Sequence, residues 1–195
     1  MRIIAGAWRG RALTSPQGQT TRPTADRVRQ ALFDRLMHAP WAGRQAIEGA
    51  KILDGFAGTG ALGLEALSRG AAQATFFEHD KQALIALRAN IAACTAQSRC
   101  DIHATDILNP PPGTPHTLIF LDPPYGKTLL EPALAALRNA GWIAPDALLT
   151  IETARDEDPP PIGTPLTAFQ AGAAKITVFR VDSVTTPPID SGPRQ

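Results

Sequence analysis

The stretch Lys51–Gly63, KILDGFAGTGALG, decides the fold. An apolar strand ends at Asp54, a glycine-rich loop follows, and a helix is predicted over 61–69. The pattern G-x-G-x-x-G is satisfied by Gly58, Gly60 and Gly63. With a strand before it and a helix after it, this pattern brings backbone N–H groups to a nucleotide-type ligand at the carboxyl edge of a parallel sheet. The sequence therefore predicts an α/β fold with a ligand site at that edge.

The next predicted strand, 74–77, ends in Glu78, twenty residues beyond Gly58. A carboxylate in this place can accept hydrogen bonds from ribose hydroxyls. The arrangement fits a dinucleotide and another adenosine ligand equally well. A NAD enzyme also needs substrate groups for hydride transfer, usually from a further domain, and little of the 195-residue chain is left to build one.

The turn Leu121–Gly126, LDPPYG, follows a strand over 117–120 whose unbroken apolar run is typical of a strand buried on both faces. Its two prolines stiffen the turn, because each fixes its own φ and restricts the residue before it. The Asp122 carboxylate and the proline carbonyls then form rigid acceptors beside the ring of Tyr125. Such acceptors suit the exocyclic amine of a planar base on which the ring can stack. Together with the glycine loop, this turn favours S-adenosylmethionine-dependent methylation of an amine over a simple helix cap.

Composition restricts the compartment and the class of site. No apolar run approaches the roughly 20 residues that span a bilayer, and no signal-peptide stretch follows the first arginines. Cys94 and Cys100 are too few for a disulfide scaffold and wrongly spaced for zinc, and the four histidines lack metal-ligand spacing. We therefore expect a cytoplasmic protein without a membrane span and without a metal site.

Charge is distributed unevenly along the chain. Residues 1–50 contain eight arginines, no lysine and three acids, a net charge of +5, whereas residues 51–195 have a net charge of −4. A basic N-terminal segment that faces a polyanion is predicted, with a solvated helix face as the alternative. Weak alternation over 1–13 predicts a small hairpin that turns near Gly6.

Periodicity and capping residues predict the remaining elements. A helix begins at Pro23 and ends near Met37, and Asp80 caps a second helix. The other predictions are a strand near Ile102 that leads to Asp106, a helix over 131–140, a strand over 147–151, an exposed loop over 155–165, and an antiparallel hairpin of 166–170 with 175–181. We divide the chain into a basic extension over 1–21, a main domain over 22–182 and a disordered tail over 183–195.

Three motifs together resemble the 16S ribosomal RNA (guanine-N2)-methyltransferase D family, whose members act at guanine 966. They are RPTADRVRQALF over 22–33, DGFAGTGALGLEALSRGA over 54–71 and FLDPPY over 120–125. The resemblance spans residue 1 to about residue 181 and implies a Rossmann-like class I methyltransferase with a seven-stranded, mostly parallel sheet and one antiparallel strand. Two positions depart from the pattern: Gly55 replaces a bulkier residue, which predicts a looser cofactor loop, and Gly126 stands where a longer side chain is common.

The resemblance also implies roles for individual residues. S-adenosylmethionine would be bound by Asp54, Phe56, Gly58, Gly60, Glu78, Asp106 and Asp122, with Glu78 on the ribose, Asp106 on the adenine amine and the 54–60 loop along the methionine part. The catalytic set would be Asp122, Pro123, Pro124 and Tyr125, which bind and orient guanine N2. The RNA contacts would be Arg2, Trp8, Arg9, Arg11, Arg22 and Arg29. The implied partner is 16S ribosomal RNA within a small-subunit particle, and the enzyme is expected to be a monomer.

Three alternatives stay open at this point. A DNA adenine-N6 methyltransferase would use the same turn, and a protein-glutamine methyltransferase more often has Asn in place of Asp122. An RNA-binding assembly factor without catalysis would keep only the basic segment. Intact Asp122, Tyr125 and Glu78 argue against lost catalysis, and the arginine-rich segment favours RNA over protein.

Overall fold

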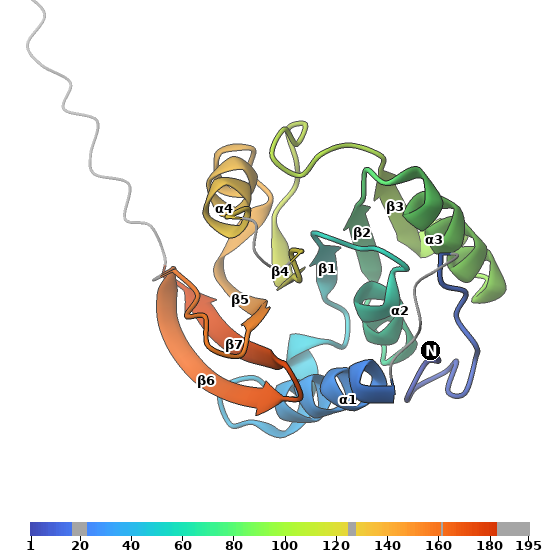
Figure 1. The fold of residues 1–195 in the computed structure, drawn as a ribbon, viewed down its shortest axis with the longest axis horizontal. Coiled ribbons are helices and arrows are strands. Elements are labelled where there is room, and N and C mark those ends of the chain that lie inside the picture. The colour runs from blue at the N-terminus through green and yellow to red at the C-terminus, as the bar shows by residue number, and fades with distance from the viewer. Residues whose placement is uncertain (17–22, 125–127, 161, 183–195) are drawn as a thin grey trace, which may run out of the picture.

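The central feature of the fold is a seven-stranded sheet covered by helices (Figure 1). The computed structural model describes residues 1–16, 23–124, 128–160 and 162–182. The strand order is β3-β2-β1-β4-β5-β7-β6. Strands β1 to β5 run parallel to one another, and β7 is antiparallel to both β5 and β6. This confirms the predicted mostly parallel sheet with one antiparallel strand.

The elements follow one another largely as predicted. In chain order they are α1 (Pro23–His38), a 3-10 turn (Arg44–Ala46), β1 (Lys51–Asp54), α2 (Ala61–Ser68), β2 (Gln73–Phe77), α3 (Lys81–Ala93), a 3-10 turn (Gln97–Arg99), β3 (Cys100–His103), β4 (His116–Leu121), α4 (Leu130–Asn139), β5 (Ile143–Ala154), β6 (Gly163–Ala171) and β7 (Ala174–Val181). The Asp80 side chain caps α3 by accepting from the Ala83 N–H. Strand β6 begins inside the loop predicted over 155–165, so that prediction is wrong at its end.

Strand β5 is longer than its predicted span of 147–151. It begins at Ile143, and Asp146 within it has a φ of 58°, in the left-handed region. The pairing with β4 shifts at this point, because His116 pairs with Ile143 while Leu118 pairs with Leu148. The Pro145-Asp146 pair has the composition of a turn, which is why the strand start was predicted after it. In the structure, β5 instead continues through this pair as a bulge in the sheet.

Side chains of the central strands alternate between the two faces of the sheet. Ile52 and Phe120 pack in the core on the side of α1, α2 and α3, whereas Leu53 and Leu121 pack in the core on the side of α4. Figure 1 shows α4 separated by the sheet from the other three helices. Because successive residues of a strand point to opposite faces, this alternation decides which side chains reach the space beneath α1.

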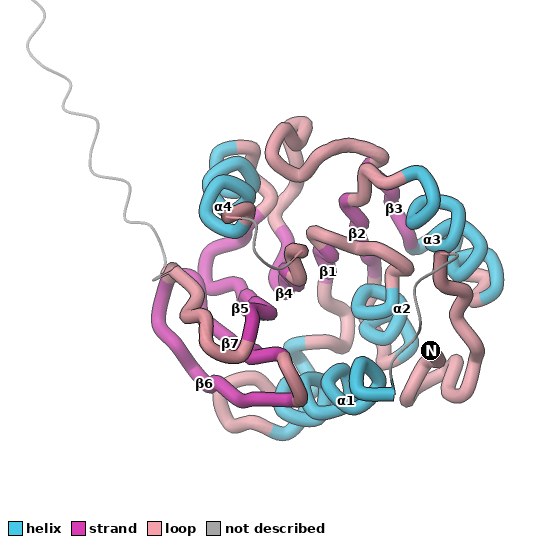
Figure 2. Tube along the Cα trace, in the orientation of Figure 1, coloured by secondary structure: helices cyan, strands magenta, loops and turns pink. Residues whose placement is uncertain are grey.

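The basic N-terminal segment, residues 1–13, belongs to the core rather than hanging outside it. Arg2 and Ala12 form a single antiparallel bridge, and Ile3 and Leu13 are buried in the same core as α1 and α2. The segment is loop for most of its length and lies beside α2 (Figure 2). Burying a side chain of this size contributes about 1.5–3 kcal/mol, so the hairpin is part of what stabilises the domain.

A close approach of two backbones holds this segment against the end of α2. The Ala7 N–H donates to the Ser68 carbonyl oxygen at 2.8 Å, and the Trp8 N–H donates to Ser68 Oγ at 3.0 Å. Gly6 passes so near Ser68 that a Cβ there would lie 1.8 Å from the same carbonyl oxygen. The φ of 81° at Gly6 also favours glycine, which explains the turn predicted at this residue.

Within the described parts of the chain, no helix combines the length and the apolar character needed to cross a membrane. The predicted tail over 183–195 lies outside the described residues.

Candidate active site

The loop between β1 and α2 presents its backbone at the carboxyl edge of the sheet. Gly58 and Gly60 have φ values of 53° and 77°, a region that side chains disfavour. No atom lies within 4 Å of the position that a Cβ on Gly58 would occupy, so this residue has open space beside it. Gly63 lets α2 approach β2, because a Cβ there would lie 2.4 Å from Cε1 of Phe76. Gly58 and Gly60 thus allow the turn, Gly58 also leaves space for a ligand, and Gly63 allows α2 to pack closely on β2.

Gly55, the position where the sequence predicted a looser loop, makes close contacts on the α4 side of the sheet. Its N–H donates to the Phe120 carbonyl oxygen at 2.9 Å, which ties the start of the loop to β4. A Cβ on Gly55 would lie 2.4 Å from Cδ2 of Leu121 and 2.7 Å from Cδ1 of Ile107. The space that a side chain would need is therefore already filled by neighbours from the α4 side of the sheet.

A cavity of about 540 Å³ lies between α1 and the carboxyl ends of β1, β4 and β5. Helix α1 and the glycine loop contribute Ala25, Val28, Arg29, Leu32 and residues 56–59 to its lining. The strand ends contribute Asp54, Leu121, Asp122, Thr150, Ile151 and Glu152. Its volume is within the range of roughly 300–1,000 Å³ for small-molecule sites. Open α/β sheets bind ligands at this edge, so the cavity is the candidate active site.

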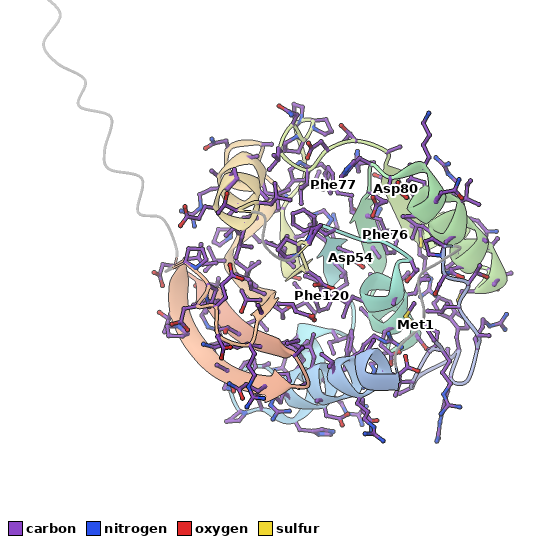
Figure 3. The ribbon with its side chains drawn as sticks, viewed as in Figure 1. Met1, Asp54, Phe76, Phe77, Asp80 and Phe120 are labelled. Atoms are coloured by element: carbon purple, nitrogen blue, oxygen red, sulfur yellow. The ribbon has the colours of Figure 1, made fainter. Side chains whose placement is uncertain are left out.

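Three carboxylates line this cavity from neighbouring strands. Asp54 ends β1, Asp122 directly follows β4, and Glu152 lies near the end of β5. Leu121 pairs with Ile151 across β4 and β5, so Asp122 and Glu152 come next on adjacent strands. Each acid follows a residue whose side chain packs on the α4 side, and alternation turns the acids toward α1. Figure 3 shows Asp54 close to Phe120, near the middle of the molecule.

Burial changes the acidity of two of these groups. The pKa of Asp54 is raised to about 7, chiefly by desolvation; a hydrogen bond from the Gly63 N–H at 3.0 Å opposes the rise, and the Glu78 carboxylate adds a smaller one. The pKa of Asp122 is raised well above its usual range by desolvation and then by repulsion from Glu152 and Asp54. Asp122 lines the cavity and is exposed, so water in the cavity reaches its carboxyl. A cation in the cavity would favour the ionised forms of both groups.

Glu78 and Asp106 lie at the same edge but outside the lining of this cavity. Glu78 Oε2 accepts from the Gly58 N–H at 2.8 Å, and Oε1 accepts from the His79 and Asp80 N–H groups, each at 2.8 Å. A carboxylate offers about four acceptor positions, so Glu78 keeps about one. Asp106 is exposed and accepts from the Leu108 N–H at 3.0 Å. Their predicted contacts with ribose and adenine stay predictions.

The proline turn borders a second, smaller cavity of about 230 Å³. Pro123 and Pro124 line it together with Glu152, which also lines the larger cavity. Tyr125, predicted to stack on the target base, lies outside the described residues. Sequence reasoning missed Glu152, although an acid directly after the predicted strand 147–151 was a usable signal.

Comparison with known proteins identifies the family. The family model described as conserved hypothetical protein 95 matches residues 1–181. The ribosomal RNA small subunit methyltransferase D of Haemophilus influenzae is 41% identical over 170 residues, covering 85% of this chain and 83% of that protein. The enzyme of the same name from Escherichia coli K12 is 44% identical over 154 residues, covering 78% of this chain and 74% of that protein. The chain belongs to the ribosomal RNA small subunit methyltransferase D family.

Solved structures support the same fold for this member of the methyltransferase D family. The Escherichia coli protein yhhF superposes with a TM-score of 0.78 at 37% identity, covering 94% of this chain and 98% of that one. The rRNA methyltransferase aviRa of Streptomyces viridochromogenes, at 18% identity, superposes with a TM-score of 0.62 over 93% and 92% of the two chains and shows the fold alone. The Rossmann-like methyltransferase fold implied by the sequence is therefore confirmed.

In this chain, Arg29 is buried, which argues against the RNA contact predicted for it. Its side chain is 4% exposed, and Nη2 donates to Asp26 Oδ1 at 2.9 Å and to the Arg2 carbonyl oxygen at 2.5 Å. Its Nε lies 3.6 Å from Oε2 of the fully buried Glu65, which also binds Arg69. Removing one member of a buried ion network leaves uncompensated charge, so Arg29 has a supporting role inside the domain.

The other predicted RNA contacts of this methyltransferase D chain have different surroundings. Arg2, Arg9 and Arg11 are exposed, and Arg11 donates to the Ala93 carbonyl oxygen of α3. Trp8 is half-buried, and the Arg99 guanidinium lies over its ring, 5.0 Å from the centre. Arg22 lies outside the described residues.

Proposed function

We propose that this chain transfers a methyl group from S-adenosylmethionine to the exocyclic N2 of a guanine in 16S ribosomal RNA. The observation that carries the proposal is the position of Asp122, which faces the cavity from the proline-bounded turn beside the glycine loop. Relatives that are named ribosomal RNA small subunit methyltransferase D support the reaction class and the substrate class.

The residues around the cavity fit S-adenosylmethionine. This cofactor would supply an electrophilic methyl group on a positively charged sulfonium. Gly58 offers open space beside the backbone, and Asp54 and Asp122 offer negative charge on the facing wall. Phe56 and Gly58 would line the methionine part, while Gly60 maintains the turn. Glu78, with one acceptor position left, would take one ribose hydroxyl, and Asp106 would take the adenine amine.

Asp122 and the Pro123 carbonyl would accept the two N–H groups of guanine N2. That nitrogen is a weak nucleophile because its lone pair is delocalised into the ring. Acceptors on both hydrogens favour a pyramidal nitrogen and stabilise the positive charge that grows as the N–C bond forms. The nitrogen then loses one proton, and the carboxylate of Asp122 is placed to take it. Asp122 has to be ionised for this step, and the positive charge of a bound sulfonium would favour its ionised form.

The target guanine has to be unpaired or extruded, because stacked neighbours cover the faces of the base from which a methyl group would approach the amine. Pro124 and Tyr125 would hold the extruded base at the turn. The exposed side chains of Arg2, Arg9 and Arg11 would contact phosphates of the RNA around it. We further propose that the enzyme acts as a monomer on a small-subunit particle, a substrate that places the reaction in the cytoplasm.

Mapping methylated nucleosides in small-subunit RNA tests this function. RNA from cells with and without the gene would be digested and analysed by mass spectrometry. The proposal predicts that one N2-methylguanine disappears without the gene and returns when the wild-type gene is restored. Loss of N6-methyladenine from DNA instead, or of methylglutamine from a protein, would support one of the alternative activities. An unchanged nucleoside map would favour an assembly factor without catalysis.

A further inference from the structure

We propose that Glu152 makes the site specific for guanine by accepting the N1–H of the target base. This inference rests on the proposed function and assigns a residue to it that neither the glycine motif nor the proline turn contains. Asp122 and the Pro123 carbonyl recognise an amine, which guanine and adenine both carry. A further group is therefore needed to distinguish the two bases.

The position of Glu152 matches this role. It comes next to Asp122 across the β4–β5 pairing, where Leu121 pairs with Ile151. It lines the larger cavity together with Asp54 and Asp122, and the smaller cavity together with Pro123 and Pro124. Among the described residues, Glu152 thus lines both cavities. Its carboxylate lies near enough to Asp122 to raise the pKa of that carboxyl. A base amine held at Asp122 would have its neighbouring ring atom next to Glu152.

The hydrogen-bonding pattern of the bases supplies the discrimination. Guanine carries two donors side by side, N1–H and N2–H₂, on nitrogens that are both bonded to C2. Two neighbouring carboxylates can therefore accept from both. Adenine carries a donor at N6 but an acceptor lone pair at N1, which would face the Glu152 carboxylate without a hydrogen. A mismatch in such a bidentate contact costs about 10-fold to 100-fold in preference. The pair Asp122 and Glu152 therefore favours guanine and disfavours adenine.

Glu152 also interacts within the protein, so a loss of activity alone would not separate base recognition from support of β5. A substrate with an altered base makes this distinction. 2-Aminopurine keeps the exocyclic amine of guanine but has an acceptor at N1 in place of the N1–H. A carboxylate at residue 152 would disfavour it, whereas the amide of Glu152→Gln can donate to that acceptor.

The experiment uses RNA segments with guanine or 2-aminopurine at the mapped target nucleotide, ligated into small-subunit RNA and assembled into particles. Single-turnover methylation by wild type, Glu152→Gln and the distant control Glu48→Gln is followed by mass spectrometry. We expect wild type and Glu48→Gln to prefer guanine by about 10-fold to 100-fold. We expect Glu152→Gln to lower that ratio at least 10-fold, with a slower reaction on guanine and a faster one on 2-aminopurine.

An equal fall of both rates in Glu152→Gln, with the ratio unchanged, would overturn the inference and leave Glu152 a support of the strand. If Glu152→Gln fails to fold, Glu152→Asp replaces it. The shorter carboxylate should react more slowly on guanine but keep the guanine preference, and loss of that preference would overturn the inference. A wild-type enzyme that forms no N2-methylguanine on guanine particles would overturn the proposed function, and this inference with it.

Discussion

At the scale of single residues, the site depends on carboxylates held where their charge is unfavourable. Asp54 is 2% exposed, and Asp122 shares its cavity with Asp54 and Glu152. Desolvation raises the pKa values of Asp54 and Asp122, and repulsion adds to the rise, from Glu78 at Asp54 and from Glu152 and Asp54 at Asp122, so part of the negative charge is absent near neutral pH. A bound cation reverses this balance, because it favours the ionised form of each neighbour. We therefore expect the binding of a cationic cofactor to release protons.

Binding of S-adenosylmethionine near pH 7 should release protons. The sign follows from the raised pKa of Asp54, about 7 in the free protein, which a neighbouring sulfonium lowers. Calorimetric titrations in buffers of different ionisation enthalpy measure the number of protons exchanged. The release from Asp54 should shrink well above pH 7, where this carboxyl is already ionised in the free protein, and Asp54→Asn should reduce it. Proton uptake on binding, or no exchange at pH 7, would contradict this coupling.

Sequence reasoning succeeded for site residues that belong to local motifs and failed for residues whose environment depends on distant partners. Asp54 and Asp122 end predicted strands, so their place at the sheet edge followed directly. Glu152 follows the predicted strand 147–151 in the same way, but its place beside Asp122 depends on the register between β4 and β5. Arg29 has the sequence context of an exposed helix arginine, but its partner Glu65 lies on another helix. The sequence around Arg29 and the sequence around Glu65 therefore do not predict that the pair is buried.

At the scale of elements, the N-terminal segment and α1 form one wall around the site. Ile3 and Leu13 are buried with Leu32 and Phe33 of α1, and the Ile4 N–H donates to Glu65 Oε2 at 2.7 Å. The segment thus supports the helix that lines the cavity. Its expected role as a separate RNA-binding extension explains only its exposed arginines.

Two glycines in this segment allow a matched test of that packing. Gly6 and Gly10 have similar φ values, 81° and 83°, but only Gly6 lies against Ser68, and nothing lies within 4 Å of a Cβ at Gly10. Gly10→Ala should cost about 1–2 kcal/mol for the left-handed backbone alone. Gly6→Ala should lower the free energy of unfolding by at least about 2 kcal/mol more, because the segment has to move off α2. Urea unfolding measures both, and equal destabilisation would mean that the packing against Ser68 contributes little.

The elements themselves were predictable where capping and periodicity agree. Helix α3 begins directly after its cap Asp80, and α2 ends one residue before its predicted end. The sequence prediction missed the start of β5 because pairing with β4, rather than a local sequence preference, stabilises the bulge at Asp146. Tertiary pairing decided that boundary, as it often does for strands.

At the scale of the whole molecule, charge is divided between the substrate-facing regions. The first 50 residues carry a net charge of +5, whereas acids line the cavity. The basic surface suits the phosphates of an RNA, and the acidic cavity suits a cationic cofactor and a base with two donors. This division of charge is consistent with RNA binding at the basic surface and methyl transfer in the acidic cavity.

Arg9→Ala should weaken binding to small-subunit particles and make it less dependent on salt. Arg9 is exposed, and removing one arginine–phosphate interaction should reduce the slope of log affinity against log salt by about 1. Filter binding at several salt concentrations gives that slope, with the exposed Arg155→Ala of the distant β5–β6 loop as the control. Cofactor affinity should stay unchanged in both variants. The same salt slope for wild type and Arg9→Ala would show that Arg9 is only a solvated side chain.

The central claim, that Asp122 acts on a guanine amine in this cavity, is tested most directly by single-turnover methylation of unmethylated small-subunit particles. Wild type, Asp122→Ala, Asp122→Asn and the exposed control Asp156→Ala would be compared, with the modified nucleoside identified by mass spectrometry. We predict N2-methylguanine from wild type and the control, and a rate lower by about 10²- to 10³-fold for Asp122→Ala. Particle affinity should change less than the rate, and Asp122→Asn should react faster than Asp122→Ala. A near-wild-type rate for Asp122→Ala would contradict the account.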